Sequence, residues 1–379
     1  MLKQELGIYI HIPFCKKKCY YCDFVSYSNK CDEIGKYIES LIKEINDFDF
    51  SKYEVTTIYI GGGTPSFIES KYIIKILNTI FYKIENHNNI EITLEANPGT
   101  VTRHKLQDYK EAGINRLSIG LQVTQDNLLK EIGRIHTYKE FLETYKNAEK
   151  VGFENINVDL MLGLPNQTIE DLKESLEKIV CLKPNHISIY SLIVEEGTQI
   201  SNLIEKGKLQ LPDEKLERNM YWYVKNFLEL NGFNHYEISN FAKKGKESKH
   251  NLNCWEQKHY IGFGVSAHSY IEDKRFCNIS NLEKYIKNLE KNEIKLNKII
   301  EETQTLEDKK KEYMMLGFRK IEGISISKFK EKFVDNPIYL YRESLNKLVK
   351  EGLIEITLDN IKLTNKGLDL ANLVFEEFV

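Results

Sequence analysis

The sequence predicts an α/β fold whose centre is a parallel sheet of six βα units. Three features predict it: short apolar runs typical of buried strands, helical patterns between them, and polar, glycine-rich stretches directly after them. Helical patterns such as 36–48 and 169–182 are long enough to cross back over a sheet, so neighbouring strands should be parallel. Such a sheet is either open and doubly wound or a curved, incomplete version of the (β/α)8 barrel. The strand-like runs are GIYIHI, TTIYIG, EITLEA, RLSIGL, NINVDLM and HISIYS, at residues 7–12, 56–61, 91–96, 116–121, 155–161 and 186–191.

The segments that follow these runs predict where function lies. In both candidate folds, active sites form at the carboxyl ends of the parallel strands. Three cysteines follow the first run, and the next four runs end in or lead into GGGTPS, LEANPG, IGLQ and VDLMLGLP. Five of the six strand ends therefore carry a candidate site residue.

Two further regions follow the predicted barrel of residues 1–235. We expect residues 236–303 to extend the edge of the barrel, with a short strand and a polar loop that contains HNLNCW. Residues 304–379 contain patterns for two or three helices and then a hairpin that turns at Asp359-Asn360, which is the outline of a winged helix. Glutamates interrupt the lysines of its helices, so we expect a docking or lid domain and not a DNA-binding one.

Composition limits the partners and the compartment. A chain of 379 residues with 41% apolar residues can form one large domain and a smaller one. The net charge is −3 with the two signs interspersed, so nucleic acid is not an expected partner. The odd number of cysteines, 7, and the lack of a secretory signal pattern predict reduced thiols. No apolar run approaches the length of a membrane span, so we expect a soluble cytoplasmic protein.

Cys15, Cys19 and Cys22 form a C-x3-C-x2-C pattern on the loop that leaves the first strand. Such a loop can hold three corners of a [4Fe-4S] cluster, and the missing fourth thiolate would leave one iron open to a ligand. The alternatives are a zinc site completed by His11 or Asp23, or unrelated buried thiols. Zinc-binding cysteine pairs usually occur twice, and the chain has no second C-x-x-C. The other four cysteines, Cys31, Cys181, Cys254 and Cys277, are isolated in the sequence and are expected to be small buried hydrophobic residues.

Residues at the other strand ends could bind a ligand that carries an amine, a carboxylate and hydroxyl groups. Glycine permits close backbone approach, so Gly62, Gly63 and Thr64 could bring bare backbone against an amine. A carboxylate could accept from that amine or from hydroxyl groups, and a guanidinium fork suits a carboxylate. Each of these side chains, taken alone, could also be an ordinary ion-pair residue. The side-chain candidates are Glu95, Gln122, Arg134 and Asp159.

The cysteine pattern followed by GGGTP at residues 61–65 resembles the radical S-adenosylmethionine (SAM) superfamily. The resemblance implies a partial (β/α)6 barrel in which the amino and carboxyl groups of SAM chelate the open iron of the cluster. It also implies that an electron from the cluster splits SAM into methionine and a 5′-deoxyadenosyl radical. Residues that this resemblance adds to the SAM site are Tyr9, Tyr21 and Ile193.

Over most of residues 8–200 the chain resembles the oxygen-independent coproporphyrinogen III oxidase (HemN/HemW) family. Its dehydrogenase branch has a fourth cysteine two residues beyond the third and an N-terminal extension, whereas Phe24 stands here and the first strand begins by residue 7. Its heme-chaperone branch has phenylalanine at this position and an H-N-x-x-Y-W motif after the barrel. This chain has HNLNCW at 250–255, so Cys254 replaces the tyrosine. Any role that needs the phenol is therefore in doubt.

The resemblance implies a heme chaperone that holds a [4Fe-4S] cluster and SAM and delivers heme to an acceptor. His250 is the candidate axial ligand and Trp255 could stack on the porphyrin, although a histidine that orients its own loop is the alternative. The competing functions are coproporphyrinogen III dehydrogenase, whose activity we do not expect, and a radical SAM enzyme for another small substrate. Expected partners are a heme-acceptor protein, which could bring the chain to a membrane surface, and an electron donor.

Overall fold

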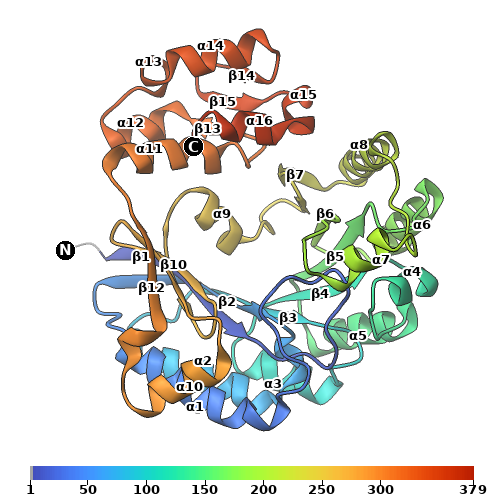
Figure 1. Cartoon of the computed structure of the whole chain (residues 1–379), viewed down its shortest axis with the longest axis vertical. Helices are drawn as coiled ribbons and strands as arrows, with labels where there is room; N and C mark the ends of the chain where they lie inside the picture. Colours follow the sequence, from blue (N-terminus) through green and yellow to red (C-terminus); the bar gives the residue numbers. More distant parts are fainter. Residues whose placement is uncertain (1–2) are drawn as a thin grey trace.

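A twelve-stranded sheet forms the centre of the computed structural model, which describes residues 3–379 (Figure 1). The strand order is β12-β11-β10-β9-β1-β2-β3-β4-β5-β6-β8-β7, and β1 to β6 are all parallel. The two edge strands do not pair with each other, so the barrel is curved but incomplete, and the predicted fold class is confirmed. The six central strands are β1 (Gln4–Ile12), β2 (Tyr53–Gly62), β3 (Glu91–Ala96), β4 (Arg116–Gln122), β5 (Ile156–Leu162) and β6 (His186–Ser191).

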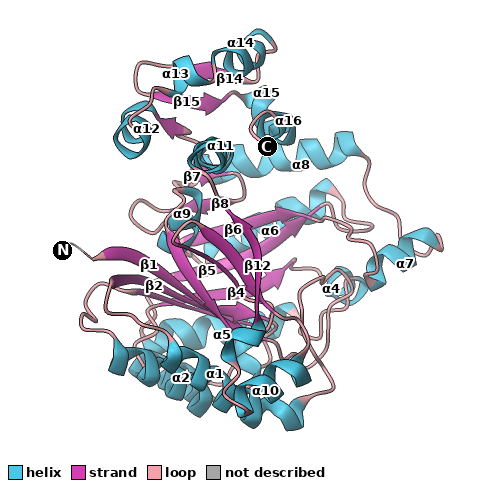
Figure 2. Cartoon of the chain, turned by 60° about the vertical axis from the view of Figure 1, so that its left-hand side comes forward, coloured by secondary structure: helices cyan, strands magenta, loops and turns pink. Residues whose placement is uncertain are grey.

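Helices cover the outer face of this sheet, as Figure 2 shows. The helices that start after Thr137 and Thr168 each begin with a capping box. In each box the threonine side chain accepts from the backbone N–H three residues later, and the acidic side chain there, of Glu140 or Asp171, accepts from the backbone N–H of the threonine. Apolar helix faces pack on the sheet and make the main hydrophobic core. The helices of the six units are α1 (Ile34–Asp47), α2 (Ser70–Lys83), α3 (Arg103–Glu111), α4 (Asp126–Glu131), α5 (Tyr138–Val151) and α6 (Ile169–Cys181), with short 3-10 turns at Cys31–Glu33 and Pro65–Phe67.

Alternation along the strands separates this core from the interior of the barrel. In β4, Leu117, Ile119 and Leu121 belong to the outer core. The residues between them, Ser118, Gly120 and Gln122, line a cavity on the inner face. Because successive side chains point to opposite faces, one strand serves both the core and the cavity. All seven of its residues are buried.

The sheet continues beyond the barrel on both sides. Strand β9 pairs in parallel with β1, and β10, β11 and β12 follow in antiparallel order. On the other side, β8 and β7 pair antiparallel after β6. The added strands are β7 (Asn234–Glu237), β8 (Asn240–Ala242), β9 (His259–Phe263), β10 (His268–Ile271), β11 (Lys274–Asn278) and β12 (Lys298–Thr303). The helices in this part of the chain are α7 (Gln199–Glu205), α8 (Glu214–Leu230) and α10 (Leu282–Glu290), with a 3-10 turn at Ile294–Asn297.

The HNLNCW motif does not lie on a polar loop as the sequence predicted, but on the helix α9 (Lys249–Trp255). Ser248 is the residue that starts it, because its side chain accepts a hydrogen bond from the backbone N–H of Asn251. Asn251 and Asn253 within the motif have a low intrinsic preference for helix interiors. The serine cap and the packing of α9 between the barrel and the C-terminal region outweigh that preference.

The C-terminal region has a hydrophobic core of its own, which includes Phe318, Phe329 and Leu345. A three-stranded antiparallel sheet in the order β13-β15-β14 packs with helices on top of the barrel's extension, and its hairpin turns at residues 357–359 (Figure 1). This is the predicted winged-helix outline. Its elements are α11 (Leu306–Gly317), β13 (Ile324–Ser325), α12 (Ile326–Phe333), α13 (Pro337–Leu340), α14 (Arg342–Lys350), β14 (Ile354–Ile356), β15 (Asn360–Leu363), α15 (Asn365–Asp369) and α16 (Ala371–Glu376). Within residues 3–379, no helix combines the length and the apolar character needed to cross a bilayer.

Candidate functional site

A cavity of about 410 Å³ opens at the carboxyl ends of the central strands. It brings together residues from the cysteine loop and from five strand ends, which is where the sequence placed the site. The predicted residues that line it are Cys15, Cys19, Tyr21, Cys22, Gly62, Gly63, Thr64, Glu95, Gln122, Arg134 and Asp159.

The cysteine loop is fastened at both ends by backbone hydrogen bonds. Cys15 N–H donates to the carbonyl of Tyr27 at 3.0 Å, and Tyr20 N–H donates to the carbonyl of Ile132 at 3.0 Å. Tyr20 and Tyr21 pack on a small apolar cluster that includes Leu129. The loop therefore presents its thiols to the cavity from a fixed base.

Burial disfavours the thiolate form of two of the three cysteines. Burial and the neighbouring charge of Cys19 raise the pKa of Cys22 to about 11, and burial also raises the pKa of Cys15. Among residues 3–379, the loop sulfurs are not one of the groups whose ligand atoms all lie within 4.8 Å of one another. A single tetrahedral ion with zinc–sulfur bonds would need sulfurs roughly 3.8 Å apart. The three sulfurs are therefore not gathered at the spacing that a single tetrahedral zinc ion requires.

Two glycines let the second strand end pack against this loop. A Cβ on Gly63 would lie 3.0 Å from the Sγ of Cys15 and 3.0 Å from two backbone atoms. Gly62 has a φ of 107°, and a Cβ there would lie 2.6 Å from the ring of His11. The N–H groups of Gly62, Gly63 and Thr64 donate within the protein. The backbone carbonyl oxygens of this segment are the kind of acceptor that an amine ligand needs.

Arg134 lies between the cysteine loop and the neighbouring strand end. Its guanidinium donates to the Oδ1 of Asn97 at 2.7 Å, to the Sγ of Cys19 at 3.5 Å and to the carbonyl of Gly120. The Nε of Arg134 is buried and has no hydrogen-bond partner in the described chain. An unpaired buried donor of this kind fits an anionic ligand group such as a carboxylate.

Glu95 and Asp159 place two carboxyl groups on the inner face of the sheet. Glu95 accepts from Tyr59 Oη at 2.9 Å and from Gly62 N–H at 3.2 Å. Burial and the charge of Asp159 raise the pKa of Glu95 to about 7. Burial raises the pKa of Asp159 as well, although Asn157 and Ser118 donate to it. Two buried carboxyl groups whose ionised forms are disfavoured in this way fit a cationic ligand, because its charge would stabilise them.

Gln122 reaches the cavity because the strand is irregular. The pairing of β4 with β5 shifts by one residue between Gly120 and Gln122, and Gln122 has a φ of 77°. A bulge of this kind turns a side chain toward a new direction, and positive φ in a residue other than glycine is a form of strain that gathers at functional sites.

Two predicted SAM residues do not line the cavity. Ile193 is 70% exposed beyond the end of β6. Tyr9 lies below the cavity, where its hydroxyl bonds the Nδ1 of His11 at 3.0 Å and its ring stacks on Tyr59. Several residues that do line the cavity were not predicted from the sequence, above all Tyr59, Asn97, Ser118 and Tyr190. Asn97 could have been predicted, because residues two apart along a strand point to the same face and Glu95 was already a candidate.

The structure places His250 and Trp255 away from this cavity. His250 is 8% exposed, its Nδ1 lies 2.9 Å from Thr57 Oγ1, and its ring packs on Tyr59. Burial and the charge of Arg116 lower the pKa of His250 to about 4, so the imidazole is neutral at pH 7. Tyr59 thus separates His250 from Glu95.

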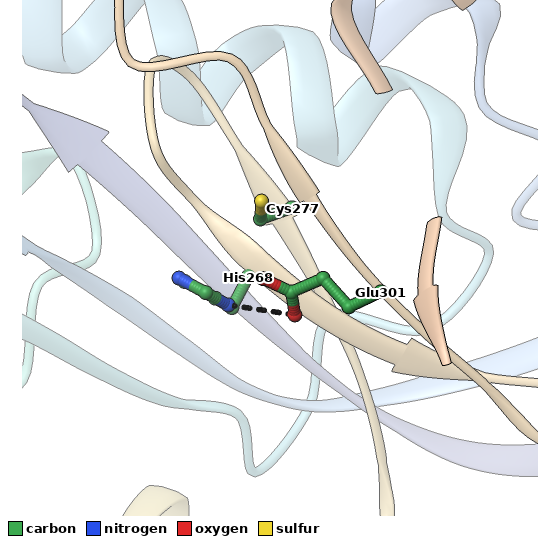
Figure 3. A group of neighbouring side chains, drawn as sticks. All are labelled: His268, Cys277 and Glu301. Carbon is green, nitrogen blue, oxygen red and sulfur yellow. Dashed lines mark ion pairs between the residues drawn. The ribbon is translucent and has the colours of Figure 1, made fainter. Parts of the chain in front are cut away.

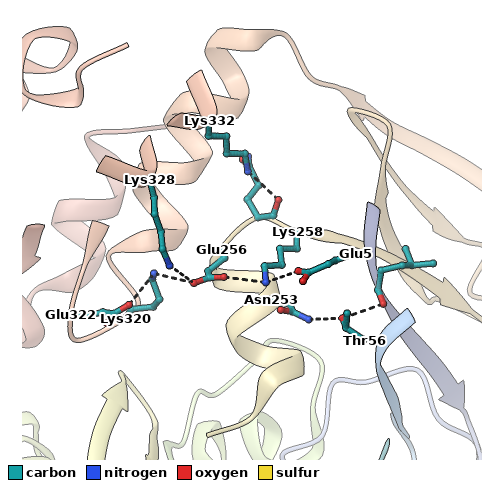
Figure 4. Close-up of polar contacts among 11 residues, drawn as sticks. Glu5, Thr56, Asn253, Glu256, Lys258, Lys320, Glu322, Lys328 and Lys332 are labelled. Carbon is teal, nitrogen blue, oxygen red and sulfur yellow. Dashed lines mark hydrogen bonds and ion pairs between the residues drawn. The ribbon is translucent and has the colours of Figure 1, made fainter. Parts of the chain in front are cut away.

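Helix α9 also joins the barrel to the C-terminal region (Figure 4). The carboxylate of Glu256 lies within 4 Å of Lys258, Lys320 and Lys328, at 3.4, 3.9 and 3.4 Å. Lys332 donates to the side chain of Gln257 at 3.1 Å. Nearby, the guanidinium of Arg319 lies 4.4 Å from the ring centroid of Trp255. The motif tryptophan therefore contacts the C-terminal region.

Known proteins resemble this chain over its whole length. The family described as Radical SAM superfamily matches residues 9–179, and the HemN C-terminal domain matches residues 304–370. Two proteins named heme chaperone HemW, from Lactococcus lactis and Bacillus subtilis, are 38% and 40% identical; the alignments cover 100% and 98% of this chain and 98% of each relative. The solved structure of coproporphyrinogen III oxidase (HemN) from Escherichia coli has a TM-score of 0.86 and 22% identity, with 99% of this chain and 90% of that chain covered.

These findings agree with the geometry of the cysteine loop and the cavity. The HemN structure shows the same fold, and its low identity carries no further conclusion. The sequence identity to the two HemW proteins, 38% and 40% over the full length, is well above the 22% identity to HemN. The chain belongs to the radical SAM superfamily and, within it, to the HemW family.

Proposed function

We propose that this chain is a heme chaperone that binds a [4Fe-4S] cluster and SAM and delivers heme to an acceptor protein. The observation that carries the proposal is the full-length similarity to two proteins named heme chaperone HemW. The position two residues after Cys22 supports the same choice, because it holds Phe24 where the dehydrogenase branch has a fourth cysteine. The protein would act in the cytoplasm with an electron donor and a heme acceptor as partners.

Cys15, Cys19 and Cys22 would hold the cluster. When bound, a [4Fe-4S] cluster supplies electron transfer and one open iron position. Arg134 would stabilise the negative charge of the Cys19 thiolate, since its guanidinium already donates to that sulfur. The raised pKa values of Cys15 and Cys22 fall when a cation takes the place of their protons.

The cavity would hold SAM. Its positive amine and sulfonium suit the two carboxyl groups of Glu95 and Asp159, and its carboxylate suits the unpaired Nε of Arg134. The Gly62-Gly63 backbone keeps room beside the cysteine loop that any side chain would fill. Tyr21 lines the same cavity, and Tyr9 supports it from below through Tyr59.

His250 and Trp255 are the residues that we propose for heme. The geometry sets a condition on this role: the imidazole must leave Thr57 and Tyr59 before it can bind an iron. Trp255 is held by Arg319 of the C-terminal region, so a movement of that region would release the tryptophan. Cys254 stands where the family motif has tyrosine and is free of disulfide bonds.

Two experiments test the cofactors. Iron and sulfide analysis of anaerobically reconstituted protein should give a full cluster in the wild type and in Cys31→Ser, and a loss in Cys15→Ser, Cys19→Ser and Cys22→Ser. Calorimetric titration with SAM should show binding that Asp159→Asn weakens by about tenfold or more, because a hydrogen bond to a charged ligand is lost. A full cluster in all three loop variants would refute the cluster assignment.

A third experiment tests the function. Heme titration followed by the Soret band should show stoichiometric binding, with a changed spectrum or weaker affinity in His250→Ala. In parallel, anaerobic holoprotein with SAM and coproporphyrinogen III should yield no protoporphyrinogen. Multiple turnovers to protoporphyrinogen would identify the dehydrogenase instead. An unchanged heme titration in His250→Ala would remove that histidine from the heme site.

A further inference from the structure

Three metal-ligating side chains meet on the extension of the sheet, outside the site described above (Figure 3). They are His268 on β10, Cys277 on β11 and Glu301 on β12, three neighbouring strands. His268 and Cys277 lie directly opposite each other in the antiparallel pair, so their side chains share one face. The histidine Nδ1, or Nε2, the cysteine Sγ and a carboxylate oxygen all lie within 4.8 Å of one another.

An irregularity in the outer strand places the carboxylate. The register of β11 against β12 shifts between Arg275 and Phe276, because Arg275 pairs with Glu302 and Phe276 with Ile300. Glu301 is therefore the extra residue of a β-bulge. Bulges turn a side chain away from the regular alternation and recur beside functional sites. Here the bulged residue brings its Oε2 to 3.3 Å from His268 Nδ1.

The group lies on the inner face of the sheet. Tyr270 pairs with Tyr260, and Tyr260 pairs with Gly7 of β1. Paired residues on neighbouring strands share a face, and so do residues two apart along one strand. His268, two residues before Tyr270, and Tyr9, two residues after Gly7, therefore lie on the same face. That face carries Tyr59, which lines the large cavity. The side chains of His268 and Glu301 are 57% and 41% exposed, so a dissolved ion can reach them.

We propose that His268, Cys277 and Glu301 bind a divalent transition-metal ion of the zinc type. The donor set of one nitrogen, one sulfur and one oxygen is the set that zinc uses, and three protein ligands leave a fourth position for water or another ligand. A thiolate and a carboxylate together match the charge of a divalent cation. Ligand atoms within 4.8 Å need to close by only about 1 Å to reach tetrahedral spacing. The proposal does not depend on the chaperone function.

The rival explanation is a surface ion pair between His268 and Glu301 with a neighbouring thiol. Such a pair is worth roughly 0–1 kcal/mol and binds no metal. The two explanations differ in stoichiometry and in ligand identity, which can both be measured on the complete protein.

The test uses holoprotein with its cluster loaded, dialysed anaerobically against chelator-buffered Zn²⁺. We expect one zinc per chain in addition to an unchanged iron content. X-ray absorption at the zinc edge should show one sulfur at about 2.3 Å, with the remaining ligands nitrogen or oxygen at about 2.0–2.2 Å. Cys277→Ser and His268→Ala should each weaken zinc binding by tenfold or more. Cys31→Ser and Cys181→Ser, which change exposed cysteines elsewhere, should leave it unchanged.

Four results would overturn the proposal. One is the absence of bound zinc at micromolar free Zn²⁺, and another is zinc binding of equal strength in Cys277→Ser and His268→Ala. Two or three sulfur ligands at the zinc, with a loss of iron, would show that zinc had replaced iron in the cysteine loop. Dependence of heme binding on His268, without any zinc binding, would assign this histidine to heme instead. Circular dichroism and iron content of each variant verify that it is folded.

Discussion

Replacing Glu95 by glutamine should stabilise the protein without its cofactors, and should do so only at neutral and alkaline pH. Burial and the charge of Asp159 raise the pKa of Glu95 to about 7, against an ordinary value of 4.5. A carboxyl group whose pKa is raised on folding stabilises the folded state while it keeps its proton, and this stabilisation is lost as the pH rises through the folded value. The difference of about 2.5 pKa units corresponds to about 3.4 kcal/mol at 1.36 kcal/mol per unit. Because Glu95 lines an open cavity, we expect about 2–3 kcal/mol.

The assay is urea denaturation of cluster-free, reduced protein at pH 5 and pH 8, followed by fluorescence. From pH 5 to pH 8, the free energy of unfolding of Glu95→Gln should rise by about 2 kcal/mol relative to that of the wild type. Glu54→Gln, which changes an exposed glutamate on the same sheet, should show no such shift. A pH-independent difference, or a variant less stable at pH 8 than at pH 5 relative to wild type, would refute the reasoning.

The same substitution should have the opposite effect on ligand binding. In the proposed site, the ionised carboxylate pairs with a cationic group of SAM, and this interaction is worth about 1.5–3 kcal/mol. Glu95→Gln should therefore weaken SAM binding by roughly 10- to 100-fold while the unliganded protein becomes more stable. If SAM bound with unchanged affinity, the carboxylate would not contact the ligand, although the prediction for stability would stand.

Three further predictions follow from particular contacts. Gly63→Ala should cost about 1–3 kcal/mol and lower the iron content, because its Cβ would meet Cys15 and backbone at 3.0 Å, whereas Gly152→Ala, which has positive φ but open space, should keep full iron content. His250 is buried and its pKa is lowered to about 4, so its contribution to stability is present above pH 6.5 and is lost as the pH falls toward 4. In urea denaturation, the free energy of unfolding of the wild type should therefore fall by about 3 kcal/mol over this range relative to that of His250→Gln. Arg319→Met removes the cation–π contact with Trp255 and should cost about 0.5–2 kcal/mol and change the tryptophan emission spectrum, and unchanged emission would contradict the contact.

The central strands could be predicted because each combines a short apolar, β-branched run with turn residues at its ends. Glu91–Ala96 and His186–Ser191 have the bounds that the sequence indicated, and the other four differ by a few residues at most. The site residues at strand ends could be predicted for the same reason: the carboxyl ends of parallel strands meet at one edge. Glu95, Gln122 and Asp159 line one cavity although they are far apart in the chain.

Other features depend on geometry that the sequence does not record. Tyr59 and Ser118 line the cavity from within strands, and their inward direction follows from strand register. Ile193 was placed by family resemblance alone and points to solvent. The group of His268, Cys277 and Glu301 arises from the pairing of three strands with a bulge, and no spacing in the sequence indicates it.

The central claim, that this chain carries heme to an acceptor, is tested most directly by heme transfer. Heme-loaded holoprotein is mixed anaerobically with heme-depleted bacterial membranes, and the heme on each fraction is measured over time after separation. The proposal predicts that membrane proteins gain heme, with recovery of heme-dependent respiratory activity, faster than from heme-loaded albumin. It also predicts that Cys22→Ser protein, without a full cluster, transfers less. Heme that stays on the chain, or transfer no faster than from albumin, would contradict the account.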